Sequence, residues 1–86
     1  MDSADCWRQL FCEWPKTIPR EGIIVTANQE TVGFVNFLVS GGILLLERDR
    51  PDSSGARKVM MAFSAITALK STNTLDLEKY KAMGFQ

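Results

Sequence analysis

Between residues 21 and 71 the sequence alternates short apolar runs with tight turns, and this alternation limits the folds open to the chain. Short runs rich in β-branched and apolar residues are typical of strands. Glycine, proline, asparagine and aspartate between the runs indicate turns, most strongly in residues 49–55 (DRPDSSG). The pattern predicts five strands, at Gly22–Ala27, Thr31–Val39, Ile43–Arg48, Arg57–Phe63 and Ile66–Lys70.

The second expected strand (TVGFVNFLV) is apolar on both faces and contains Gly33 in its interior. A glycine inside a strand usually indicates a bulge or a sharp bend. Bent antiparallel strands packed into so short a segment favour a small, partly open barrel. We therefore expect a mostly β fold, with a small five-stranded bent antiparallel barrel over residues 21–71.

A helix is expected on each side of the barrel. The first covers residues 3–14, with Ser3 as its N-cap and Pro15 ending it. Its apolar residues form one stripe with helical spacing: Cys6, Trp7, Leu10, Phe11 and Trp14. A short C-terminal helix is expected over residues 74–83, with Thr74 as its cap and Gly84 just after its end. The chain is expected to form one domain over residues 1–86.

A chain of 86 residues buries a limited share of its surface, so small folds often gain stability from disulfides, metals or oligomers. Cys6 and Cys12 point in different directions on the first helix and cannot pair within it. The sequence has no histidine and no CxxC spacing, so we expect no metal or other cofactor. Oligomerisation is the remaining route. We expect strand 57–63 of one subunit to pair with strand 66–70 of the next, head to tail, which closes into a ring.

Charge and composition exclude several classes of function. Ten Lys and Arg residues balance ten Asp and Glu residues, which gives no strong field toward nucleic acid or membrane. No apolar run is long enough to span a bilayer, and the polar N-terminus is unlike a secretory signal, so we expect a cytoplasmic protein. Without histidine, catalysis is not expected. Asp49 and Asp52 are interpreted as turn formers rather than a catalytic carboxylate pair.

The order of elements resembles the Sm/Hfq-like family over roughly residues 5–71. The resemblance lies in the leading helix, the proline-containing linker, GIIVTANQ, the glycine inside TVGFVNFLV and the closing FSAITALK segment. It implies a bent five-stranded barrel in a homo-oligomeric ring of roughly six or seven subunits. It also implies that a ring face binds single-stranded RNA.

The chain departs from the family at the residues that usually contact RNA. The position of the Tyr-Lys-His run of Hfq is taken by Ala62, Phe63 and Ser64, and the turn after the second strand reads Val39-Ser40-Gly41-Gly42. The family lysine, histidine and acid are therefore absent. The residues that stand at the pocket positions, and that we take as candidate RNA contacts, are Ser40, Gly41 and Ser64.

A second candidate RNA surface surrounds the long hairpin loop. RNA binding needs cations for phosphates and flat side chains for bases. Four cations flank this loop and could form a basic rim: Arg48, Arg50, Arg57 and Lys58. An equally weighted interpretation is a solvated loop balanced by nearby acids. The alternative to an RNA-binding ring is a non-catalytic protein-interaction or structural ring, and an exposed apolar patch would favour it.

Overall fold

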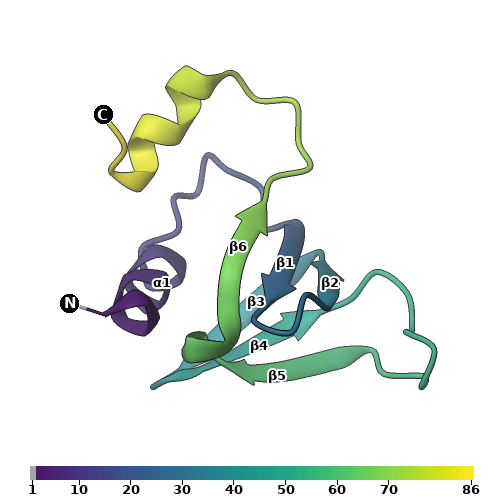
Figure 1. Ribbon diagram of the computed structural model, residues 1–86. Helices are drawn as coiled ribbons and strands as arrows, with labels where there is room; N and C mark the ends of the chain where they lie inside the picture. Colours follow the sequence, from purple (N-terminus) through teal and green to yellow (C-terminus); the bar gives the residue numbers. More distant parts are fainter. Residues whose placement is uncertain (1) are drawn as a thin grey trace.

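The computed structural model describes residues 2–86 and shows a mostly β fold with a leading helix (Figure 1). Six strands form two antiparallel sheets of three strands each. The elements, in chain order, are α1 (Ser3–Cys12), β1 (Gly22–Thr26), β2 (Thr31–Phe34), β3 (Asn36–Ser40), β4 (Ile43–Glu47), β5 (Lys58–Ala62), the 3-10 turn η1 (Phe63–Ala65), β6 (Ile66–Lys70) and the 3-10 helix η2 (Leu77–Met83).

Helix α1 begins at Ser3, as expected, and ends two residues earlier than expected. Its N-cap is Asp2, not Ser3, because the Asp2 carboxylate accepts a hydrogen bond from the Asp5 amide at 2.9 Å. Glu13 is the C-cap, so Trp14 lies beyond the helix. Most of the predicted apolar stripe faces the protein: Phe11 is fully buried, and Trp7 and Trp14 pack against the core, whereas Cys6 is exposed.

The first sheet has the strand order β2-β1-β6. Ile24 of β1 lies opposite Val32 of β2 and Leu69 of β6, and all three side chains point to the core. The pairing of β1 with β6 shifts register between Val25 and Thr26. Such a bulge bends the strand and increases its twist.

The second sheet has the strand order β3-β4-β5, and its three strands are in continuous register. Leu44 and Leu46 of β4 point inward and are completely buried. Ile43, Leu45 and Glu47, which alternate with them, point outward, because side chains alternate along a strand. One face of this sheet therefore covers the core and the other faces solvent.

The expected single strand over residues 31–39 is two strands that meet at Val35. We expected the bend at Gly33, but Gly33 lies inside the β1–β2 ladder opposite Ile23. The chain turns at Val35, whose amide donates to the Glu47 carbonyl at 2.8 Å. The bend lets β2 pair in the first sheet and β3 in the second, so residues 2–86 contain six strands where five were expected.

Strands β5 and β6 are the outer edges of their sheets and are not paired with each other in residues 2–86. They are joined by η1, and β6 runs across the direction of β5 (Figure 1). The two sheets consequently form an open structure in which β2, β3, β5 and β6 are each paired on one side only.

Aromatic side chains fill the space between the helix and the sheets. The ring of Phe11 lies within 6.3 Å, centroid to centroid, of Trp14, Phe34, Phe37 and Phe63. Phe34, Phe37 and Phe63 are buried. These three rings are therefore core residues and are not exposed for stacking on bases.

The C-terminal segment is a 3-10 helix rather than the expected helix over residues 74–83. Asp76, not Thr74, occupies the N-cap position, and its side chain makes no capping hydrogen bond. Gly84 follows the last residue of η2, and its φ of 98° is the left-handed conformation typical of that position. None of the residues of η2 is buried. The segment lies beside α1, at the end of the molecule away from the β4–β5 loop (Figure 1).

Candidate nucleic-acid interface

The three candidate pocket residues lie together at one corner of the molecule. Ser40 is the last residue of β3, Gly41 is the first residue of the turn between β3 and β4, and Ser64 lies in η1. The Phe63 amide donates to the Gly42 carbonyl at 3.1 Å and ties these two segments to each other. Ser40, Gly41 and Ser64 are all exposed, so hydroxyl and backbone groups are accessible at this corner.

An arginine that the sequence analysis did not select completes this corner. The Arg8 Nε donates to the Gly41 carbonyl at 2.9 Å, which brings a guanidinium from α1 to the β3–β4 turn. Arg8 is exposed, and an arginine has further N–H donors beyond the one used here. The corner therefore carries a cation beside accessible hydroxyl groups, the combination that phosphate contacts use.

The four loop cations lie at the end of the second sheet opposite to this corner, and the length of β4 separates the two places (Figure 1). Acids or carbonyls of the same loop engage three of them. Lys58 Nζ lies 3.5 Å from Glu47, Arg50 Nε lies 3.7 Å from Asp49, and Arg48 Nε donates to the Arg50 carbonyl at 3.3 Å. Arg57 is exposed and forms no ion pair in the described residues. This end of the sheet is nearly neutral rather than a basic rim.

Asp52 shapes the backbone of the same loop. Its carboxylate accepts hydrogen bonds from the Ser54 amide at 2.8 Å and from the Ala56 amide at 2.9 Å. The hydrogen bonds from Ala56 and then Ser54 lower the pKa of Asp52 below its ordinary value, because they favour the charged form. The turn-forming role predicted for this residue is confirmed.

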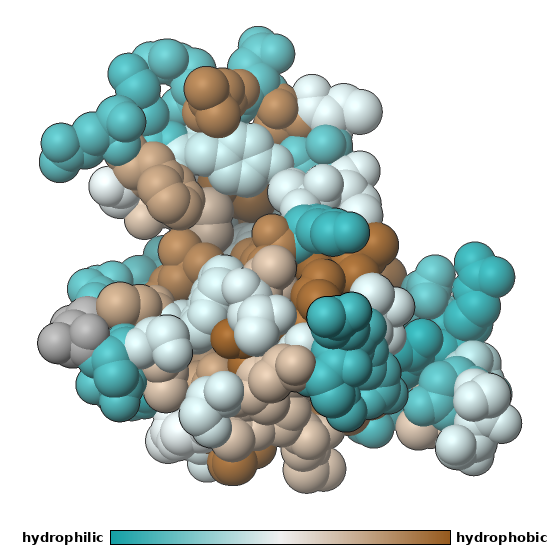
Figure 2. All heavy atoms as spheres, viewed as in Figure 1, coloured by the Kyte–Doolittle hydropathy of each residue, from teal (hydrophilic) through white to brown (hydrophobic). Residues whose placement is uncertain are grey.

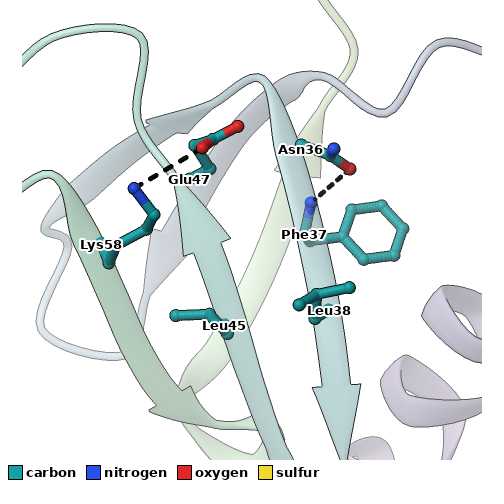
Figure 3. Close-up of a pocket in the computed structure, with 6 residues that line it drawn as sticks. All are labelled: Asn36, Phe37, Leu38, Leu45, Glu47 and Lys58. Carbon is teal, nitrogen blue, oxygen red and sulfur yellow. Dashed lines mark hydrogen bonds and ion pairs between the residues drawn. The ribbon is translucent and has the colours of Figure 1, made fainter.

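A row of apolar side chains crosses the outer face of the second sheet. Leu38, Leu45 and Met60 lie opposite one another on β3, β4 and β5. Leu38 is 65% exposed and Met60 is 70% exposed. The adjacent row is polar, with Asn36, Glu47 and Lys58 on the same three strands, and the two rows border a shallow hollow of about 140 Å³ (Figure 3).

The described residues contain neither a metal-ligand cluster nor a disulfide. Residues 2–86 contain no group of three or more His, Cys, Asp or Glu side chains that could hold a metal ion. Cys6 and Cys12 are both exposed and unpaired. In the same part of the chain, no helix has the length and apolar character needed to cross a membrane.

The comparisons with known proteins gave no match to this chain among family models, curated proteins or solved structures.

Proposed function

We propose that this chain is a non-enzymatic, Sm-like subunit that assembles head to tail into a ring, and that the ring binds single-stranded RNA. In this proposal β2 and β3 count as one bent strand. The connected strand order is then β6-β1-β2/β3-β4-β5, which supports a partly open Sm-like barrel with its opening between β5 and β6. The resemblance to the Sm/Hfq-like family supplies the expectation of a ring and of RNA.

The observation that carries the proposal is the pair of free edges on β5 and β6. Each edge strand is five residues long, and neither contains a proline. The only charged residues on them stand at the ends, Lys58 on β5 and Lys70 on β6. Proteins usually protect such edges with charges, prolines or bulges, because unpaired N–H and C=O groups pair readily with another chain. The edge of β6 has a bulge at its pairing with β1 and a terminal lysine, whereas β5 has only its terminal lysine, so β5 is the less protected edge.

The core-facing side of the edge strands also supports association. Val59 and Met61 of β5 and Leu69 of β6 point to the core but stay only half-buried. Pairing with a neighbouring subunit would cover these side chains and would give hydrogen-bond partners to the unpaired N–H and C=O groups of the edge strand. Because β5 and β6 are different surfaces, the contact is heterologous, and repeating it generates a closed ring or an open filament.

For RNA we favour the corner formed by Arg8, Ser40, Gly41 and Ser64 over the β4–β5 loop. Arg8 forms no ion pair in the described residues, whereas two of the four loop cations, Arg50 and Lys58, are paired with Asp49 and Glu47. In a ring the corner repeats once per subunit, so one strand of RNA would meet a series of equivalent cations. Binding through phosphates would weaken with salt, because each contact releases a counterion.

A second candidate function is a protein-interaction ring that does not bind RNA. The exposed row of Leu38, Leu45 and Met60 favours it, because apolar patches that stay uncovered usually mark contacts with other proteins.

Binding of labelled oligouridylate and oligoadenylate, followed by fluorescence anisotropy at two salt concentrations, tests the RNA proposal. We expect an affinity that falls with salt and is lowered by Arg8→Gln. Arg57→Gln serves as the matched control, since Arg57 is an exposed arginine at the other end of the sheet. A ring that binds neither oligonucleotide would favour the protein-interaction function, and a larger loss with Arg57→Gln would move the RNA site to the loop.

A further inference from the structure

A second concave site lies between α1 and the C-terminal segment, away from the corner proposed for RNA. It is a cleft of about 230 Å³ whose walls are almost entirely apolar. Four of its lining residues are aromatic, Trp7, Trp14, Tyr80 and Phe85, and the others are Leu10, Glu21, Leu69, Ser71 and Met83. Figure 2 shows the surface hollowed between the C-terminal segment and the helix below it. The cleft is smaller than the roughly 300–1,000 Å³ of sites for drug-sized ligands, so it suits a compact group.

The aromatic walls offer ring surface rather than hydrogen bonds. The Trp14 indole N–H donates to the Ile18 carbonyl at 2.9 Å. The Tyr80 hydroxyl donates to Asn73 Oδ1 at 2.8 Å and lies 2.6 Å from Ser71 Oγ. With these polar atoms engaged, both residues can contact a ligand only through their ring carbons. The faces of such rings carry negative electrostatic potential and attract cations.

Glu21 is the charged residue of the cleft wall. It is half-buried, and it forms no ion pair in the part of the chain that the structure describes. A carboxylate without a partner beside aromatic rings adds a second source of negative potential. Charge complementarity therefore indicates a cation as the occupant.

We propose that this cleft binds a small quaternary ammonium compound, with choline as its simplest representative. A primary ammonium is strongly hydrated and needs several acceptors to replace its water. An arginine side chain needs acceptors arranged around its planar guanidinium. The cleft offers Glu21 and little other polar surface, so it can satisfy neither group. A quaternary ammonium donates no hydrogen bonds, and its methyl groups can pack against the apolar walls.

The cleft is built in a way that keeps it open. Its floor is α1 and the end of β6, and its outer wall is the segment that carries Tyr80 and Met83. A closed cycle of three hydrogen bonds holds that segment: Asn73 Nδ2 donates to Ser71 Oγ at 3.0 Å, Ser71 contacts Tyr80, and Tyr80 donates back to Asn73. A site held open before the ligand arrives loses less entropy on binding.

Intrinsic fluorescence tests the proposal directly, because the two tryptophans of the chain, Trp7 and Trp14, both line the cleft. The probes are choline and its uncharged carbon isostere, 3,3-dimethylbutan-1-ol. We expect a saturable fluorescence change with choline and about tenfold weaker binding of the alcohol, since only the charged probe gains from the rings and Glu21. No saturable change, or equal binding of the two probes, would overturn the proposal.

Two pairs of variants assign the effect to the cleft. Glu21→Gln is expected to weaken choline binding about three- to tenfold, and Glu30→Gln, at an exposed position next to β2, to leave it unchanged. Tyr80→Phe keeps the ring and should retain more affinity than Tyr80→Leu, which removes it. Unchanged binding in Glu21→Gln would overturn the site even if Tyr80→Leu disturbs the segment. If a peptide containing trimethyl-lysine binds more tightly than choline, the natural ligand is a trimethylated lysine of a protein rather than a small quaternary ammonium compound.

Discussion

The Phe63 amide donates a hydrogen bond to the Gly42 carbonyl at 3.1 Å, and this bond fixes the point at which the chain leaves the second sheet. The residues that follow form η1 and then β6 of the first sheet. Strands β5 and β6 are therefore anchored to one short turn while their free edges belong to different sheets. This arrangement prevents them from pairing within one chain and leaves both edges open to neighbours.

Phe11 joins the helix to both sheets, and its removal is expected to be highly destabilising. It is fully buried and contacts the rings of Trp14, Phe34, Phe37 and Phe63. Phe11→Ala leaves a cavity in this cluster and should cost about 3–5 kcal/mol of unfolding free energy. Leu77→Ala, at a position that is 87% exposed, should change it little. Thermal unfolding followed by circular dichroism compares the two, and similar melting temperatures would contradict the described core.

Two glycines in neighbouring strands should respond differently to alanine. A Cβ at Gly22 would lie 2.7 Å from the Lys70 carbonyl oxygen, so β1 and β6 would have to move apart. A Cβ at Gly33 would meet nothing nearer than 4.0 Å. Gly22→Ala should therefore cost about 1–3 kcal/mol, while Gly33→Ala should be neutral or slightly stabilising. Urea denaturation of both variants tests this, and the reverse order would contradict the β1–β6 pairing.

Those two glycines also show what the sequence could and could not predict. The strands were predictable because apolar and β-branched residues alternate with turn residues. Gly33 suggested the wrong bend position, since a glycine in a strand indicates either a bend or a close approach. The observed bend corresponds to the spacing of the buried residues Val32, Phe34 and Phe37. The first two are two positions apart, as in a regular strand, but the next is three positions on, so the alternation is interrupted near Val35.

The candidate site was less predictable than the strands. Ser40, Gly41 and Ser64 were selected from the sequence and do lie at one corner. Arg8 was not selected, because its contact with Gly41 joins residues 33 apart in the chain and depends on how α1 packs. The cations that flank the loop were expected to lie near one another, and they do. The ion pairs of Arg50 with Asp49 and of Lys58 with Glu47 depend on backbone geometry, which the positions of these residues in the sequence do not reveal.

The Tyr80 hydroxyl is expected to hold the C-terminal segment in place. Tyr80→Phe removes both of its hydrogen bonds, to Asn73 and Ser71, while keeping the ring. Because the site is partly exposed, we expect the segment to open about fivefold more often, equivalent to roughly 1 kcal/mol. Hydrogen exchange should show faster exchange of the amides in η2 and unchanged exchange in β4. Unchanged exchange in η2 would show that packing alone holds the segment.

The loop that Asp52 organises should become less stable at acid pH. The pKa of Asp52 is lowered in the folded protein from an ordinary value of 3.8. A lowered pKa means that its contribution to stability is present above the ordinary value and is lost as pH falls through the folded value. Asp52→Asn should remove this part of the pH dependence while keeping a side-chain acceptor. Urea denaturation between pH 3 and pH 6 measures the unfolding free energy of the wild type and of Asp52→Asn. The same pH dependence in both proteins would contradict the assigned role.

The free edge of β5 can be blocked without breaking its internal ladder. At the two ends of the β4–β5 ladder, hydrogen bonds join Phe63 to Gly42 and Arg48 to Arg57. Hydrogen-bonded and non-hydrogen-bonded pairs alternate along antiparallel strands, so Met60, opposite Leu45, falls in a non-hydrogen-bonded pair. Its N–H points to the free edge, and Met60→Pro removes that donor. Met60→Thr keeps the donor and is the matched control.

The solution mass of the purified protein, measured by light scattering, tests the central claim most directly. One chain has a mass of 9.6 kDa, so the account predicts a particle of about 58 or 67 kDa for six or seven copies. The Met60→Thr variant should keep this mass, and a folded Met60→Pro variant should fall toward the monomer. A wild-type protein that stays monomeric at high concentration would contradict the account.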